Sequence, residues 1–511
     1  MKGFGQCNCI RKGGDVEDGV VESLPKDGRT APSEATSLLA DTTPPQAEAS
    51  EASHEGFLSD VWDTLKLAIP IFVAMVSWIG MKTTDTSLLG HVGAEALSAS
   101  ALSDLWTMCS GVLVNGRILR VLVGQAVGAN NPKLAGAYLQ VSYFVLSVLA
   151  IPVIACWLST KFVWRALGQE DEITADAGYY ATVLAASIPG QIAYSQLSQF
   201  FSSQRIMHPE VIASSSALGL NLLFGLIFVL GVGIPNFSGF GFVSCPWVTT
   251  TVVYVQGFLL WYIACHRQGL HKKCWDGWSR SSVTIERIKT FSGLYFPAAL
   301  SAASDFWRMG VIGVIAANLG ELEVGVFNTS YRIMWIVLIM VSAVANAGGI
   351  KMSLRLGGGD AAGAKQAGVV IFSLALFILL AISLLVVTRI RFLGMIFTQD
   401  EEFLDMFEAS AVPFTCTLFF MNLSVAIEQI PMSMGRTSEV FWYGFVASWF
   451  GQVPGVYFLT KYWRDDLFGL YWGMAVGYVM LSILYGILAY RSDWHKYAEI
   501  AMSRSETTGN S

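Results

Sequence analysis

Four carboxylate residues stand inside long apolar runs of this sequence: Asp85, Asp104, Asp305 and Glu428. A charged side chain at the centre of a membrane-spanning helix costs about 2.5–3.5 kcal/mol on insertion scales, so its presence there indicates a function. Desolvation disfavours the charged form of a carboxyl group, so such a residue can gain a proton on one side of a membrane and lose it on the other. These four residues are therefore candidates for the reversible binding of a proton or of another small cation.

Asp305 is the strongest of these candidates. It follows Pro297 by eight residues, which places it about two helical turns into an apolar run. Arg308 lies three residues later on the same helical face and could instead hold Asp305 in a permanent ion pair. Because a permanent partner would prevent proton exchange, the coupling and the structural interpretations both stay open.

The other three acids carry similar alternatives. Lys82 precedes Asp85 by three residues and could pair with it. Asp104 stands in a semi-polar run, where it could line a cavity or cap a helical turn. Glu428 precedes Pro431 by three residues, so it could bind a proton or stabilise the kink that a proline makes in a helix.

A substrate cavity needs aromatic and polar side chains that face inward. Aromatic rings can present their π faces to organic cations, and amide side chains deep in apolar runs favour the bundle interior. The candidates for lining a cavity are Trp78, Gln196, Gln199, Phe306, Trp307, Asn328, Tyr331, Trp335, Asn422 and Gln429. Each aromatic ring could equally face lipid. Arg332 is too costly to face lipid, so we expect it in the bundle or near an interface.

The runs that carry these residues predict an all-α polytopic membrane protein. Hydrophobic residues make up 53% of the sequence and charged residues 14%, whereas soluble domains contain about 25% charged residues. Runs of about 20 apolar residues span the hydrocarbon core, where helices satisfy their own backbone. Twelve spans are expected, at Thr64–Leu89, Glu95–Val127, Leu134–Leu158, Ala175–Ser203, Val211–Gly233, Val243–Cys265, Phe291–Leu319, Val324–Ile350, Ala367–Ile390, Met406–Met434, Val440–Tyr462 and Phe468–Tyr490.

The sequence repeats itself across the polar stretch His266–Lys289. Pro70 and Pro297 occupy matching places in two apolar runs, LGQEDEI at 167–173 is answered by FTQDEEF at 397–403, and GQAVGAN at 124–130 is answered by LGGGD at 356–360. The offset stays near 227–230 residues, which indicates an internal duplication. We expect a disordered cytosolic tail at 1–57, a first lobe at 58–265, a cytosolic loop at 266–289, a second lobe at 290–490 and a cytosolic tail at 491–511.

Lysine and arginine in the predicted loops set the orientation. One side holds most of them, including Arg117, Arg120, Lys351 and Arg355, and the other holds only Lys161, Arg165, Arg389, Arg391, Lys461 and Arg464. The basic side is predicted to be cytosolic, with both termini. The membrane is expected to be the plasma membrane or a vacuolar or other endomembrane. The pattern EATSLL at 34–39 either resembles an acidic dileucine sorting signal or arises by chance.

Composition also argues against several classes of function. The net charge is −6, and no basic field is available for nucleic acid. The eight cysteines show no metal-ligand spacing, so no metal is expected, and no cofactor is expected either. The six histidines lie in tails, loops or helix ends, which argues against an intramembrane metalloenzyme. ATP-driven export is disfavoured because no G-x-x-x-x-G-K-[ST] loop occurs.

Four segments stand in the order and spacing of a known family: DTSLLGHVGA at 85–94, GQAVGA at 124–129, the stretch 167–180 and the stretch 204–209. On these segments, the chain resembles the multidrug and toxic compound extrusion (MATE) family, of eukaryotic type, over roughly residues 60–490. The resemblance implies twelve helices in two six-helix lobes that form a V around a central cavity. It also implies export of organic compounds in exchange for H⁺ or Na⁺.

The resemblance bears on three of the acids. Asp305 is similar to the acidic position of the family's seventh helix, where Glu is commoner, and Asp85 is similar to an ion-coupling position of the first helix. The family's acid in the tenth helix would fall near Asn422 or Leu423. Glu428 would have to replace it from about a turn and a half further along.

We therefore expect a secondary antiporter that exports a small organic compound, cationic or amphipathic, in exchange for protons. We expect it to work as a monomer in the lipid bilayer. The alternatives are a Na⁺-coupled exporter, a lipid-linked sugar flippase of the same superfamily, and an intramembrane enzyme. A flippase would need a large cationic cavity, whereas Lys82, Arg308 and Arg332 are the main cations expected in the membrane. An enzyme would need paired catalytic residues on facing helices.

Overall fold

The computed structural model describes residues 46–506, with side chains from 56 to 505. The chain divides after Ala52, and the larger unit, from Ser53 onward, holds every contact discussed below. The sorting pattern at 34–39 and most of the expected tail lie outside the described residues. Residues 46–57, which we expected in the tail, belong to the first helix.

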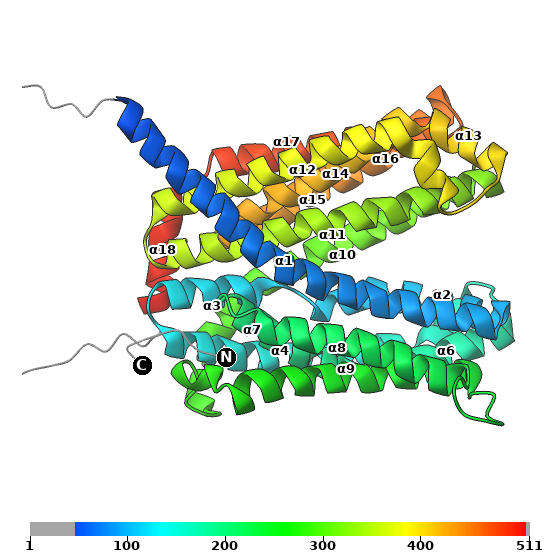
Figure 1. Ribbon diagram of the computed structural model, residues 1–511, viewed down its shortest axis with the longest axis horizontal. Coiled ribbons are helices and arrows are strands. Elements are labelled where there is room, and N and C mark those ends of the chain that lie inside the picture. The colour runs from blue at the N-terminus through cyan, green and yellow to red at the C-terminus, as the bar shows by residue number, and fades with distance from the viewer. Residues whose placement is uncertain (1–45, 507–511) are drawn as a thin grey trace, which may run out of the picture. The chain divides into compact units, whose positions relative to one another are not determined.

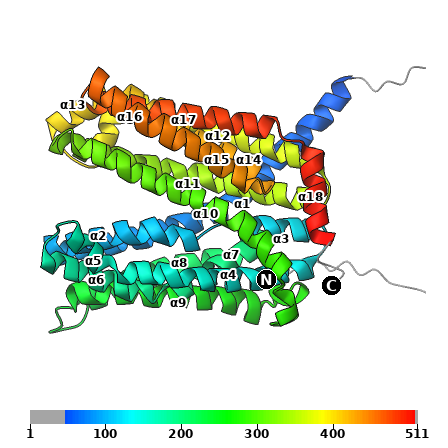
Figure 2. The same ribbon diagram turned by 180° about the vertical axis from the view of Figure 1, so that it is seen from behind.

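The first half of the described chain contains the following helices and short helical turns: α1 (Gln46–Val92), α2 (Ala94–Gly111), η1 (Val112–Val114), α3 (Ile118–Gly128), α4 (Pro132–Leu158), α5 (Thr160–Ala166), α6 (Asp171–Ala185), α7 (Ile188–Ser202), α8 (His208–Phe224), η2 (Gly225–Val229), η3 (Gly241–Ser244), α9 (Cys245–Trp261) and η4 (Tyr262–Arg267). We call α1 to α9 the first bundle. The second half contains η5 (Leu270–Lys273), η6 (Arg280–Ser282), α10 (Ile285–Ala317), α11 (Glu321–Gly357), α12 (Ala361–Met395), α13 (Glu401–Ala409), α14 (Ala411–Ser433), α15 (Thr437–Val446), η7 (Ala447–Gln452), α16 (Val453–Phe458), η8 (Leu459–Trp463), α17 (Leu467–Tyr490) and α18 (Trp494–Glu506). We call α10 to α17 the second bundle, and Figures 1 and 2 show the two groups of helices.

Ten helical stretches in the described part of the chain are long and apolar enough to cross a membrane. Two further spans are interrupted. The first is split between α6 and α7, where Pro189 stands in the first turn of α7, and the second is divided into α15, η7, α16 and η8 by turns of π-helix. With these two, residues 46–506 contain the twelve spans that the sequence predicts, and the protein is a multi-pass integral membrane protein.

The internal duplication is visible in how matching helices begin. Asn131 caps α4 and Asp360 caps α12, and each side chain accepts a hydrogen bond from the backbone N–H three residues later, at 3.2 Å and 2.8 Å. The residue before each cap has a positive φ, 58° at Asn130 and 77° at Gly359. The offset is 229 residues in both comparisons, so the repeat predicted from sequence extends to local backbone geometry.

The same repeat brings the ends of α3 and α11 into backbone contact. A Cβ atom on Gly128 would lie 2.0 Å from the carbonyl oxygen of Leu354, and one on Gly357 would lie 2.0 Å from that of Gln125. These two contacts are related by the offset of 229 residues. Only glycine allows so close an approach. The two bundles therefore meet at this end, which we call the α18 end because α18 packs there on α3, α11 and α12.

The first half of α1 packs against the second bundle, and the first half of α10 packs against the first bundle. Ala68 of α1 packs in a cluster with Ala343 and Ala347 of α11. In the matching place of the second half, Phe291 and Tyr295 of α10 are buried in the core of the first bundle. Because α1 and α10 each contact both bundles, a motion of one bundle against the other must bend or shift these two helices.

The structure contains a helix, α18, in the segment for which we expected a polar C-terminal tail. Trp494, Tyr497, Ala498 and Ala501 lie three or four positions apart, so they form one apolar face of α18. Ala498 and Ala501 are buried, and the side chain of Asn131 donates a hydrogen bond to the carbonyl oxygen of Ser505 at 3.0 Å. Because the segment is polar overall, this apolar face was not recognised from the sequence.

The loop between the bundles is attached to the first bundle. The amide of Gln140 donates to the carbonyl oxygen of Gly277 at 3.0 Å and accepts from the backbone N–H of Ser279 at 3.1 Å. A Cβ atom on Gly136 would lie 1.9 Å from the carbonyl oxygen of Cys274. The loop thus runs directly over α4.

Candidate functional site

Asp85 lies at the meeting point of three helices of the first bundle. Its side chain, on α1, is buried, with 3% of the residue exposed. One carboxylate oxygen accepts from the amide of Asn221 on α8 at 2.9 Å, and the other accepts from the hydroxyl of Thr249 on α9 at 2.8 Å. Both hydrogen-bond donors are neutral.

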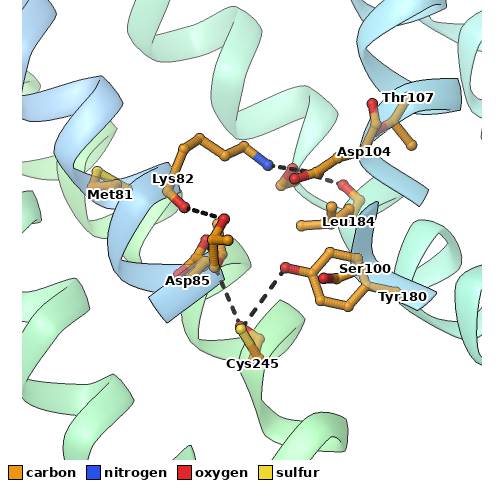
Figure 3. A network of polar contacts seen from close by, with 12 residues as sticks. Met81, Lys82, Asp85, Ser100, Asp104, Thr107, Tyr180, Leu184 and Cys245 are labelled. Atoms are coloured by element: carbon orange, nitrogen blue, oxygen red, sulfur yellow. Dashed lines mark hydrogen bonds and ion pairs between the residues drawn. The ribbon is translucent and has the colours of Figure 1, made fainter. Parts of the chain in front are cut away.

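Lys82, which the sequence suggested as a partner for Asp85, points to α2 instead. Its ammonium group lies 2.9 Å from Asp104, and Figure 3 shows this pair beside Asp85. Tyr180 of α6 and Cys245 of α9 lie on the other side, with their oxygen and sulfur atoms 3.8 Å apart. The cation is therefore paired with Asp104, and Asp85 has no cation within ion-pair distance among the described residues.

Asp305 has the opposite arrangement in the second bundle. The guanidinium of Arg308 lies 3.1 Å from its carboxylate, and 47% of the Asp305 side chain is exposed. Arg308 itself is buried and donates to the hydroxyls of Ser448 at 2.6 Å and Tyr478 at 3.4 Å. The structural interpretation of Asp305 thus matches this geometry.

Glu428 of α14 belongs to the same group of charges. It is partly buried and interacts electrostatically with Asp305 and Arg308. The cluster therefore holds two carboxylates and one guanidinium, which is paired with Asp305, so it has an excess negative charge when both acids are ionised. Such a cluster can accept one more positive charge, either as a proton or as the cationic group of a ligand.

The structure brings three of the predicted aromatic residues together. Trp335 of α11 lies 6.3 Å from Phe306 of α10 and 6.1 Å from Tyr331, measured between ring centroids. Trp307 faces the first bundle, since its indole N–H donates to the carbonyl oxygen of Cys109 on α2 at 3.3 Å. Phe306, Tyr331 and Trp335 therefore form one aromatic cluster beside Asp305.

The predicted amide residues are dispersed over the bundles. Gln196, Gln199 and Asn422 are buried, and each has a side-chain oxygen with no hydrogen-bond partner. Gln429 is partly buried and donates to Ser433 at 3.2 Å. Four of the predicted residues lie apart from these groups and are exposed: Trp78, Trp307, Asn328 and Arg332.

Sequence reasoning missed the partners of Asp85 and several in-membrane charges. Asn221 stands in an apolar run, Leu220–Phe224, which was the available signal for its inward position. Arg117 and Arg120 were counted with the loop residues although they lie inside the expected span Glu95–Val127, and Lys351 and Arg355 were placed just after the expected span Val324–Ile350. The structure places them within the spans Ala94–Gly128 and Glu321–Gly357. Their closeness to the ends of apolar runs made them resemble loop residues.

Comparison with known proteins agrees with this architecture. The MatE family model matches twice, at residues 70–227 and 297–458, one copy in each bundle. Multidrug and toxin extrusion protein 1 of Danio rerio is 22% identical over 88% of this chain and 75% of its own length. Protein DETOXIFICATION 12 of Arabidopsis thaliana is 22% identical over 86% of this chain and 90% of its own length.

Solved structures share the fold. The crystal structure of the eukaryotic MATE transporter AtDTX14 superposes with a TM-score of 0.79 at 20% identity, covering 88% of this chain and all of that one. An outward-facing multidrug resistance MATE transporter superposes with a TM-score of 0.74 at 17% identity, covering 88% and 97% of the two chains. Because the family model covers more than half of the sequence, in two copies that follow the internal repeat, this chain belongs to the MatE family of multidrug and toxin extrusion transporters.

Proposed function

We propose that this protein is a secondary antiporter that exports a cationic or amphipathic organic compound in exchange for protons. The observation that carries this proposal is the environment of Asp85, which is buried and held by neutral donors only. Burial disfavours the carboxylate, and two hydrogen bonds favour it. These opposing effects suit a group that must both gain and lose a proton during each cycle.

The second bundle supports the proposed substrate. Asp305 and Glu428 are two carboxylates near one guanidinium, so their cluster can accept a further positive charge. The nearby rings of Phe306, Tyr331 and Trp335 offer π faces to a cation. A compound with an aromatic or aliphatic body and a positive group suits these neighbours.

We also propose that the α18 end faces the cytosol and that the protein works as a monomer. Arg117, Arg120, Lys351 and Arg355 no longer count as loop residues. Even without them, Lys133, Arg205, Lys272, Lys273, Arg436 and Arg491 remain in loops or helix ends on the predicted cytosolic side. The plasma membrane and the vacuolar or other endomembranes are the proposed locations.

Purified full-length protein in lipid vesicles tests the coupling ion. We expect an imposed pH gradient to drive transport of a fluorescent organic cation against its concentration gradient, with no requirement for Na⁺. The oxygen of Asn221 that lacks a partner beside Asp85 is a feature that would suit Na⁺. Transport that follows an imposed Na⁺ gradient and ignores the pH gradient would exclude proton coupling.

A further inference from the structure

The second membrane span of the first bundle is broken in its interior. The α-helix α2 ends at Gly111, the turn η1 covers Val112–Val114, and α3 begins at Ile118. Tyr295 of α10 stabilises the break, because its hydroxyl donates to the carbonyl oxygen of Leu113 at 2.8 Å and accepts from the N–H of Gly116 at 3.0 Å. A broken helix in a transporter is a common place for substrate groups to bind.

Two arginines follow the break on one face of the helix. Arg117 and Arg120 are three residues apart, so their side chains lie on the same side. Arg120 donates to the side-chain oxygen of Asn346 on α11 at 2.8 Å, which shows that this side faces the second bundle. Arg117 is exposed. Because lipid would be a costly neighbour for a guanidinium, its exposure is best explained by space between the bundles that water can enter.

Neither arginine has a carboxylate within ion-pair distance among the described residues, and one nitrogen of Arg120, Nε, is buried with no hydrogen-bond partner. Glu210 of α8 interacts with both arginines only through its electric field. Its carboxylate accepts a hydrogen bond from Ser198 at 2.5 Å instead. Arg117 and Arg120 carry two positive charges and Glu210 carries one negative charge, so this part of the spanning helices has a net positive charge.

A buried amide adjoins the same break. Gln199 of α7 is 4% exposed and donates to the carbonyl oxygen of Gly116 at 3.1 Å. Its own side-chain oxygen has no hydrogen-bond partner. The site therefore offers guanidinium donors for an anion and, beside them, one free acceptor for a hydroxyl or amine group of the same ligand.

We propose that Arg117 and Arg120 bind the carboxylate of the exported compound, so that the preferred substrates are amphoteric organic molecules with one anionic and one cationic group. Guanidinium groups suit carboxylates because they donate two parallel hydrogen bonds. The cationic group would face Asp305 and Glu428 in the second bundle. The inference rests on the proposed function for the transport of such compounds, but the binding site itself can be tested without transport.

A rhodamine dye with a free carboxylate and the methyl ester of the same dye provide matched probes. Fluorescence polarisation with the full-length protein in detergent gives the affinity for each. We expect the wild type to bind the free acid about tenfold more tightly than the ester, which is the order expected for charge-assisted hydrogen bonds. We expect Arg117→Gln and Arg120→Gln to lose this preference while binding the ester like the wild type. Arg117→Lys should keep part of it, because the charge remains.

The acid-to-ester ratio separates a binding role from a structural one, since a folding defect weakens both dyes equally. Arg389→Gln, which removes an exposed arginine of α12, serves as the control and should keep the wild-type ratio. Equal affinity for the two dyes in the wild type, or an unchanged ratio in both glutamine variants, would overturn the anion site. A different outcome would reject the proposed function but not the anion site. In that outcome, the wild type binds the free acid more tightly than the ester, but vesicles transport neither dye under a pH gradient.

Discussion

At the scale of single residues, the two membrane aspartates differ in what holds them. Asp85 has two neutral donors, whereas Asp305 has a buried guanidinium at 3.1 Å. A neutral environment permits the loss of charge, and a nearby cation opposes it. Asp85 is thus better suited to carry a proton, although the sequence alone favoured Asp305.

The pair between Lys82 and Asp104 protects this property of Asp85. In Asp104→Asn, the ammonium of Lys82 loses its partner at 2.9 Å and can turn toward Asp85, three residues along the same helix. We expect transport driven by a pH gradient to fall by about tenfold or more, an effect of about 1.4 kcal/mol. Vesicle transport assays measure this.

The double variant Lys82→Met/Asp104→Asn is the matched control, because it removes the cation as well. It should recover much of the activity that the single variant loses. Activity in the single variant equal to that of the wild type would show that Lys82 does not influence Asp85.

Arg308 has a larger structural role than Asp305. Replacing Arg308 with Met leaves the buried Ser448 without its partner and leaves Tyr478 only its contact with the sulfur of Met309, at a cost of about 1–3 kcal/mol for each lost hydrogen bond. The side chain of Asp305 is 47% exposed, so Asp305→Asn should cost only about 0–1 kcal/mol. Thermal unfolding in detergent should therefore show a clearly lower Tm for Arg308→Met than for Asp305→Asn, and the reverse order would contradict this assignment.

The sequence singled out the acids in the apolar runs but not their partners. Asp85 was recognised because a carboxylate in an apolar run is conspicuous. Asn221 and Thr249 lie 136 and 164 residues away from it along the chain, and no local pattern shows that α1, α8 and α9 meet. Whether Lys82 pairs with Asp85 or with Asp104 also depends on where α2 packs.

At the scale of elements, the contact between α3 and α11 depends on glycine. Gly128 and Gly357 each face a carbonyl oxygen of the other helix, with no room for a Cβ atom. The two helices end here, in matching places of the repeat. Any motion of the bundles that opens this end would have to separate this contact.

A methyl group at this contact should hold the two helices apart. In Gly128→Ala, the new Cβ atom would lie 2.0 Å from the carbonyl oxygen of Leu354, so the backbones must separate. We expect faster hydrogen–deuterium exchange at residues 350–360 and slower transport. Gly310→Ala, where no atom lies within 4 Å of the added carbon, is the control. Similar exchange in both variants would indicate that the contact is not tightly packed.

Continuous apolar helices could be predicted from the sequence, and interrupted or short ones could not. Hydropathy located the ten long spans, with ends that differ from those of the structure by up to eight residues, because length and composition alone define them. The split span of α6 and α7 was expected as one helix. The amphipathic helix α18 was missed because its apolar face comprises few residues, such as Trp494 and Ala501, in a polar segment.

At the scale of the whole transporter, a group of buried charges links the two bundles. Lys351 of α11 is 1% exposed at its side chain and lies 2.9 Å from Asp60 of α1. Arg355, one turn later, lies 2.8 Å from the same carboxylate. Separating these groups would leave a buried charge without its partner, which is costly. The group therefore holds the first half of α1 on α11 near the α18 end.

Asp60→Asn should weaken the attachment of α1 to α11, because the amide cannot balance two cations. We expect faster hydrogen–deuterium exchange in the last turns of α11 and in α18 than in the wild type. Asp63→Asn on the same helix is the control, because its pair with Lys66 is exposed and 3.9 Å long. If the two variants exchange alike, the charges at Asp60 do not hold α1 on α11.

The most direct test of the account is proton movement that depends on substrate. A pH-sensitive dye inside vesicles of the full-length protein reports proton flux when an organic cation is added. The account predicts that the wild type shows this flux, that Asp85→Asn loses it, and that Asp305→Asn keeps most of it. Substrate-dependent proton flux that persists in Asp85→Asn and disappears in Asp305→Asn would contradict it.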